Sequence, residues 1–147
     1  MSAPMLTHEE ISSCIPHAGD MVLLDHIASW DDTTIYAVAT SHRNADNPLR
    51  NDKNLGIAAG IEYAAQAIAV HGYWLARQSA GKVRTGRIVS VRDISCTVQQ
   101  LDNIVEDLKI QATQLLLDDA AMNYVFAIHA GSSLLMQGRV TISLTDD

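Results

Sequence analysis

The sequence predicts an α+β fold in which a curved antiparallel sheet wraps around one long central helix. Residues 56–74 are almost all small or apolar and belong to a helix predicted over about 56–79. The second half of the chain alternates apolar and polar residues with the period of strands, and the turns between those strands are short. Because the alanines and glycines of the helix give it a thin surface, a sheet could approach it closely on every side.

The first half supplies one short helix and two strands. "THEEISSC" predicts a helix with Thr7 as its N-cap and Glu10 completing a capping box, ending before Pro16. "MVLLDHIASW" and "TIYAVATS" are rich in aliphatic and β-branched residues and predict two strands joined by a tight turn. Residues 42–55 are polar and irregular and predict a loop.

Four strands are expected after the long helix. "GRIVSVRDISCTV" predicts a long strand, and "VEDLKIQATQLL", "MNYVFAIHA" and "SLLMQGRVTISL" predict an antiparallel meander. Two strands, one helix and four strands in this order fit the hot-dog architecture. An open sheet edge would remain, so we expect a homodimer or a higher homo-oligomer.

Length and composition indicate one domain over 1–147. The two cysteines fit neither a disulfide framework nor a metal site, which favours a reducing compartment and predicts no metal. The N-terminus has no basic start and no apolar leader, so a cytoplasmic location is expected. A net charge of −7 argues against nucleic-acid binding. Polar residues interrupt the longest apolar run, so no membrane span is expected.

Two polar residues interrupt the apolar helix on one face. Glu62 and Gln66 stand four residues apart and therefore lie one above the other. A buried carboxylate is costly unless it has partners or a chemical task. Apolar surroundings two turns inside the helix would favour its protonated form, and such a group can give or take a proton. His71 would point to the opposite side, as a core or interface histidine.

The start of the helix is a second candidate element. Free backbone N–H groups at Gly56 and Ile57 would form the positive end of the helix dipole, and Gly56 would let a ligand approach the backbone. These groups could bind a carbonyl oxygen that gains negative charge.

A histidine is the third candidate. His17 follows Pro16 in a turn before the first strand, whereas His26 lies inside that strand. A turn histidine is the better proton carrier of the two, although it could also simply cap the turn. His8, His42 and His129 receive no role.

Positive charge gathers after the helix. Five of the ten Lys and Arg residues fall between positions 77 and 92, and the candidates for docking an acidic partner among them are Arg77, Lys82, Arg84 and Arg87. A solvated basic loop is the alternative interpretation.

These motifs resemble a known family. "IPHAGDMVLLDHI", then "GIEYAAQAIAVHG", then "GRIVSVRDI" are similar to segments of the hot-dog-fold 3-hydroxyacyl-[acyl carrier protein] dehydratases, and most similar to the subgroup of aryl-polyene pigment clusters. The similarity runs from about residue 8 to 143. It implies loss of water from a (3R)-hydroxyacyl thioester, carried on the phosphopantetheine of acyl carrier protein, to give the trans-2-enoyl thioester without metal or redox cofactor.

The resemblance also implies roles for single residues. Glu62 matches the helix carboxylate, Gln66 matches the glutamine four residues later, and Gly56 corresponds to the helix-start glycine, one residue further from the glutamate than in fatty-acid dehydratases. The fatty-acid enzymes carry a catalytic histidine shortly before the helix, where this chain reads "NADNPLRNDKNLG". His17 is the leading substitute. It would remove the C2 proton, while protonated Glu62 helps the 3-hydroxyl group leave.

Two other functions stay open at this point. A hot-dog acyl thioesterase would use Glu62 to activate water or attack the thioester and would need no histidine. A catalytically silent partner subunit of a second dehydratase would retain the fold without turnover.

Overall fold

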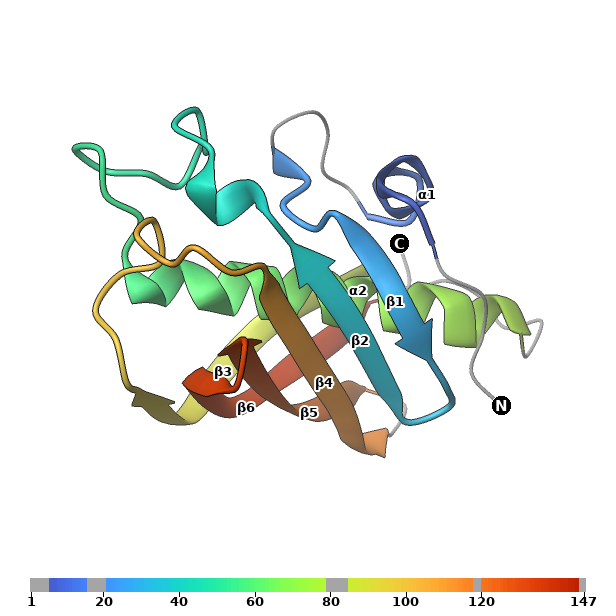
Figure 1. The fold of residues 1–147 in the computed structure, drawn as a ribbon. Coiled ribbons are helices and arrows are strands. Elements are labelled where there is room, and N and C mark those ends of the chain that lie inside the picture. Colours follow the sequence, from blue (N-terminus) through green and yellow to red (C-terminus); the bar gives the residue numbers. More distant parts are fainter. Residues whose placement is uncertain (1–5, 16–20, 79–84, 118–119, 146–147) are drawn as a thin grey trace.

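Helix α2 crosses one side of a six-stranded antiparallel sheet (Figure 1). The computed structural model describes residues 6–15, 21–78, 85–117 and 120–145. The strand order is β1-β2-β4-β5-β6-β3, and the elements are α1 (His8–Ser12), β1 (His26–Trp30), β2 (Thr34–Ala39), α2 (Gly60–Gln78), β3 (Thr85–Cys96), β4 (Leu108–Leu117), β5 (Ala121–Ala130) and β6 (Ser133–Thr145). The predicted α+β arrangement with one long helix is confirmed.

Helix α1 begins with the predicted capping box. The Thr7 hydroxyl accepts a hydrogen bond from the Glu10 N–H, and the Glu10 carboxylate accepts one from the Thr7 N–H. Just before this cap, Leu6 exchanges two backbone hydrogen bonds with Ile27. The outer edge of β1 is therefore partly covered by the N-terminal segment.

The predicted meander of β4, β5 and β6 is also confirmed. Burial alternates along β5, so every second side chain enters the core between sheet and helix. Gly60 lets the helix approach this core closely, because a Cβ at this position would lie 2.8 Å from the Met136 sulfur. The start of α2 is thereby fixed close to the sheet.

The first predicted strand is only half formed. Only His26–Trp30 pair within the sheet, and the pairing is preceded by a hydrogen bond from the Asp25 N–H to the Val38 carbonyl. Val22, Leu23 and Leu24 are all buried. A run of three buried residues does not fit the alternation of a strand with one wet face, so residues 22–24 are buried without pairing within the sheet.

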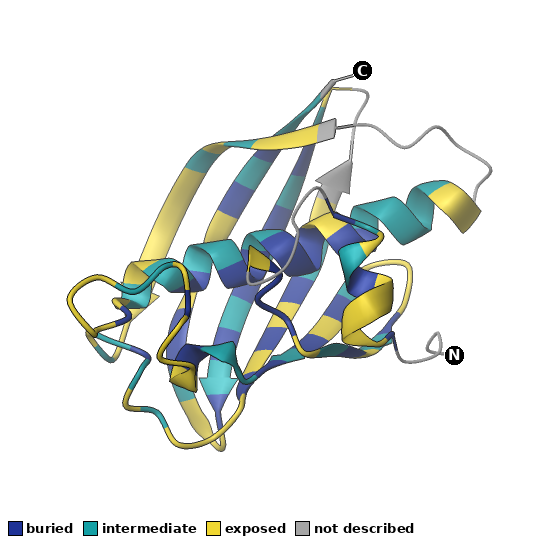
Figure 2. Ribbon diagram, turned by 90° about the horizontal axis from the view of Figure 1, so that it is seen from above, coloured by how far each residue is buried: buried dark blue, intermediate teal, exposed yellow. Residues whose placement is uncertain are grey.

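The long helix starts later than predicted. A 3₁₀ turn, η3 (Ile57–Ala59), precedes α2, so Glu62 lies in the first turn of α2 and not two turns inside it. The curved sheet lies against α2 mainly through β2, β4 and β5. Along α2, Ala69 is exposed, whereas Gly72 faces the Met122 side chain of β5. Figure 2 shows both buried and half-buried stretches along the helix.

Strand β3 forms an open edge of the sheet. Among the described strands it pairs with β6 alone, and its outward apolar side chains include Val89 at 55% exposure. A bulge interrupts the pairing at Asp93, whose φ is 55°. Opposite the bulge, Gly138 leaves room for the Ile94 side chain, with which a Cβ at position 138 would clash. No helix in the described part of the chain is long and apolar enough to span a membrane.

Candidate active site

Glu62 and Gln66 share one face at the start of α2, as predicted from their spacing. The Gln66 side-chain Nε2 lies 3.4 Å from Glu62 Oε1, a long hydrogen bond. Glu62 is half-buried, whereas Gln66 is 1% exposed. Because Glu62 stands in the first helical turn, it lies near the positive end of the helix dipole, which attracts negative charge. The site thus presents one accessible carboxylate backed by a buried amide.

Gln66 also holds the backbone of Met21 and Leu23. Its Oε1 accepts a hydrogen bond from the Leu23 N–H at 2.9 Å, and its Nε2 donates to the Met21 carbonyl at 2.7 Å. Since this segment lies outside the sheet, its backbone groups need partners other than a neighbouring strand. The amide of Gln66 provides these partners.

Tyr63 organises a second set of contacts beside Glu62. The Ser41 hydroxyl donates to the Leu23 carbonyl at 2.7 Å, so the Tyr63 hydroxyl, 2.7 Å from Ser41 Oγ, donates to Ser41. Asn47 Nδ2 donates to Tyr63 at 3.2 Å. Burial raises the pKa of the Tyr63 hydroxyl, which therefore remains a neutral donor. Ser41 and Asn47 were not predicted from the sequence, although a tyrosine inside an apolar helix indicates a buried hydroxyl that needs partners.

The helix start differs from the expectation of free backbone donors. The Ile57 N–H donates to the Gln99 carbonyl at 3.0 Å, so it is already engaged, and the prediction of a free donor at Ile57 was wrong. Gly56 precedes η3 as its N-cap. A Cβ at Gly56 would meet no described residue within 4 Å, so the described part of the chain leaves space beside its backbone. Gly56 is thus the accessible part of this candidate element.

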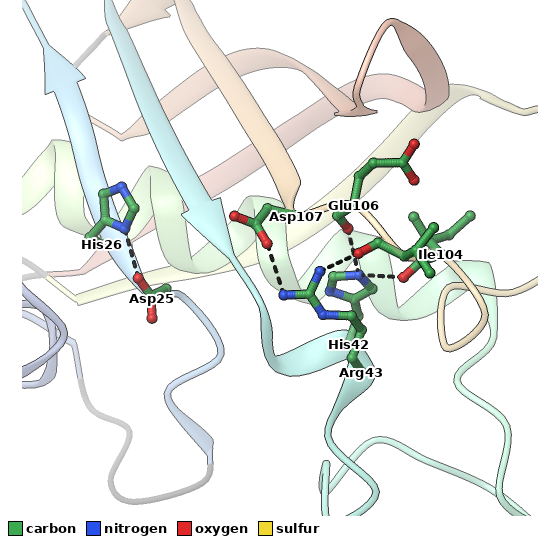
Figure 3. A network of polar contacts seen from close by, with 8 residues as sticks. Asp25, His26, His42, Arg43, Ile104, Glu106 and Asp107 are labelled. Atoms are coloured by element: carbon green, nitrogen blue, oxygen red, sulfur yellow. Dashed lines mark hydrogen bonds and ion pairs between the residues drawn. The ribbon is translucent and has the colours of Figure 1, made fainter.

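Two of the histidines considered, His26 and His71, have partners within the chain, and a third, His17, lies outside the described residues. His17 belongs to residues 16–20, which lie outside the described residues. His26 lies on β1, where its Nδ1 is 2.7 Å from the Asp25 carboxylate (Figure 3). His71 is fully buried, which confirms the prediction of a core histidine. Its Nε2 donates to the Asp31 carbonyl at 2.8 Å, so its Nδ1 accepts from the Tyr124 hydroxyl at 2.6 Å.

His42 anchors the loop before β4. The buried ring donates through Nε2 to the Ile104 and Glu106 carbonyls at 3.1 and 3.0 Å (Figure 3). The neighbouring Arg43 forms an ion pair with Asp107 at 2.8 Å. Burial lowers the pKa of His42 and of His71 alike, so both rings are neutral at pH 7.

The basic candidates are only partly described. Arg77 is exposed at the end of α2, with its guanidinium 5.7 Å from the centre of the Tyr73 ring and 6.0 Å from that of Trp74. Arg87 is exposed on β3, while Lys82 and Arg84 lie outside the described residues. Within the described ranges, no group of three His, Cys, Asp or Glu side chains is placed to hold a metal ion.

A curved antiparallel sheet on one central helix, with an accessible carboxylate in the first helical turn, defines a protein of the hot-dog class. Residues 9–147 match the ApeP-like family, described as ApeP dehydratase. The chain therefore belongs to the ApeP-like dehydratases, and the predicted resemblance to the aryl-polyene dehydratases is confirmed. No curated protein sequence matches the chain.

Solved structures share this fold. The dehydratase heterocomplex ApeI:P from Xenorhabdus doucetiae contains a chain 25% identical to this one, with a TM-score of 0.82 over 93% of this chain and 91% of that one. A thioesterase mutant from Pseudomonas aeruginosa has 11% identity and a TM-score of 0.66, covering 93% and 92% of the two chains. A putative thioesterase from Silicibacter sp. has 12% identity and a TM-score of 0.66, covering 96% and 93%. The two thioesterases show the fold alone.

Proposed function

We propose that this chain removes water from a (3R)-hydroxyacyl thioester on acyl carrier protein and gives the trans-2-enoyl thioester. The observation that carries this proposal is the place of Glu62, half-buried in the first turn of α2 in a chain of a dehydratase family. Elimination needs a group that protonates the departing hydroxyl, and a positioned carboxyl group can do so.

The proposed reaction moves protons only. His17 takes the C2 proton, the C2 electron pair forms the new C2–C3 double bond, and the 3-hydroxyl leaves as water with the proton of Glu62. Return of a proton from His17 to Glu62, directly or through water, would restore both groups. The thioester carbonyl lies at the open backbone of Gly56, before Ile57, where the start of the helix stabilises the charge that develops on its oxygen.

Mass spectrometry of a 3-hydroxyacyl-carrier protein incubated with the chain tests this function. We expect the acyl group to lose the mass of one water with the wild-type chain, and the Glu62→Gln rate to be lower by about 10² to 10⁴. Glu9→Gln is the matched control, because Glu9 is an exposed glutamate in the first turn of α1. Release of the whole acyl group would show a thioesterase instead, and an unchanged substrate would show that the chain alone has no activity.

A partner subunit is the second part of the proposal. The Xenorhabdus structure is a dehydratase heterocomplex, and among the described residues the outer edge of β3 pairs with no strand and Ala69 of α2 is exposed. We propose that a second hot-dog subunit, another copy or a different dehydratase, pairs with β3. If the chain has no activity alone but accelerates that of its partner, it acts as the silent subunit.

The exposed arginines support the proposal that the acyl substrate is attached to an acidic carrier protein. Arg77 is held in place by the rings of Tyr73 and Trp74, and Arg87 lies on the exposed strand β3. Along the helix, Arg77 is about 22 Å from Glu62 at 1.5 Å per residue. A carrier protein docked at Arg77 and Arg87, with Lys82 and Arg84 proposed to join them, would therefore reach Glu62 through its long phosphopantetheine arm.

A further inference from the structure

The amide of Gln66 is engaged entirely within the chain. Both Nε2 hydrogens have acceptors, at the Met21 carbonyl 2.7 Å away and at Glu62 Oε1 3.4 Å away. Its Oε1 accepts from the Leu23 N–H. The orientation of the amide is fixed, because the Leu23 N–H can only donate and the Met21 carbonyl can only accept. At 1% exposure, the group has no donor left for a substrate.

From these contacts we infer that Gln66 is a positioning residue, which ties the carboxylate of Glu62 to the backbone of Met21–Leu23, and not a ligand of the acyl chain. The inference replaces the substrate-binding role that the family resemblance implies for Gln66. Only its expected effect on kcat rests on the proposed function.

The segment that Gln66 holds makes this role necessary. Met21–Leu23 lie outside the sheet, so no neighbouring strand fixes their distance from α2. Leu23 is instead held at both backbone groups, its N–H by Gln66 and its carbonyl by Ser41. Both of these partners connect to α2, Gln66 directly and Ser41 through Tyr63. Hydrogen bonds at both backbone groups of Leu23 therefore connect the segment to the helix turn that bears Glu62.

A ligand and a positioning residue differ in what their replacement changes. A ligand of the acyl chain contributes to binding, so its removal raises the dissociation constant. A positioning residue acts on the geometry of the carboxylate, so its removal lowers kcat and leaves binding nearly unchanged. Gln66→Met tests this difference, since methionine has a similar length without a polar group and leaves the Leu23 N–H unpaired.

Three measurements distinguish a positioning role of Gln66 from a role as a ligand. Amide exchange followed by NMR should be about tenfold faster at Leu23 in Gln66→Met, because one buried hydrogen bond is lost. The dissociation constant for a carrier protein bearing an amide-linked acyl group, which cannot react, should change by less than about twofold. With a 3-hydroxyacyl-carrier protein, kcat should fall about tenfold or more at a nearly constant KM.

Tyr124→Phe is the matched control. It also removes a buried hydrogen bond to α2, at His71, which stands nine residues after Glu62 and therefore about 13 Å further along the helix. We expect Leu23 exchange, binding and kcat to be unchanged in this variant. A dissociation constant raised about tenfold in Gln66→Met would overturn the inference, as would unchanged exchange at Leu23. If the wild-type chain showed no dehydration, the proposed function would fail, while exchange and binding would still decide the role of Gln66.

Discussion

The hydroxyl groups of Tyr63 and Ser41 lie 2.7 Å apart. Tyr63 directly follows Glu62 in α2. Tyr63→Phe would leave the amide of Asn47 and the Ser41 oxygen short of a partner, so we expect the free energy of unfolding to fall by about 1–2 kcal/mol. Denaturant titration of Tyr63→Phe, Ser41→Ala and the double variant should give a coupling energy of about 0.5 kcal/mol or more. Additive effects of the two substitutions would show that the pair is not coupled.

His17 is predicted to carry the C2 proton, so His17→Ala should nearly abolish dehydration, by about 10² to 10⁴ in rate. His26→Ala is the control, because His26 already contacts Asp25 on the edge strand β1. The same mass-spectrometric assay measures both variants. Full activity in His17→Ala would remove this residue from the mechanism.

Arg87 should steer an acidic carrier protein toward the chain. At low salt, Arg87→Glu should reduce kcat/KM for a carrier-bound substrate about tenfold, and the difference should shrink as salt screens the charges. Lys109→Glu makes the same change in charge on β4 and should leave kcat/KM almost unaltered. Equal losses in both variants would indicate an effect of net charge and not a docking site.

The β3 edge should carry the subunit contact. Sedimentation velocity should show a dimer for the wild-type chain and a monomer for Val89→Lys, because a charge on an edge strand opposes pairing with another strand. Tyr36→Lys is the control, since Tyr36 is a similarly exposed apolar residue at 43% but lies on β2, inside the sheet. A wild-type monomer would contradict the homodimer and direct the search to a different dehydratase subunit.

Two buried histidines should make the fold sensitive to acid. Burial lowers the pKa of His71 and His42 in the folded chain, whereas the unfolded chain titrates near the ordinary pKa of about 6.5. Below this pH the unfolded state binds protons that the folded state does not, so the free energy of unfolding decreases as the pH falls. For His71, the nearby Asp31 and Asp32 oppose part of this effect.

The free energy of unfolding should change by at most about 1.4 kcal/mol per pH unit for each histidine. Urea unfolding at several pH values between 7.5 and 5 measures it. His71→Gln should show a smaller slope than the wild-type chain, because glutamine does not titrate. Equal slopes in the two proteins would assign the acid sensitivity to other groups.

Local sequence patterns predicted most of the fold. The capping box at Thr7 and Glu10, the alternation along β5 and the shared face of Glu62 and Gln66 all depend on residues close in sequence. The partners of Gln66 could not be predicted in this way, since Leu23 is 43 residues distant. The first strand was predicted to begin too early for a related reason. The side chains of Gln66 and Ser41, and not a neighbouring strand, bind the backbone of Leu23.

The long sequence separation between Gln66 and Leu23 has a consequence for folding. Helix α2 and the β4–β5 and β5–β6 hairpins consist of local contacts, which form early, whereas a contact that closes a 43-residue loop forms late. We therefore expect catalysis to return after the helical circular-dichroism signal on refolding.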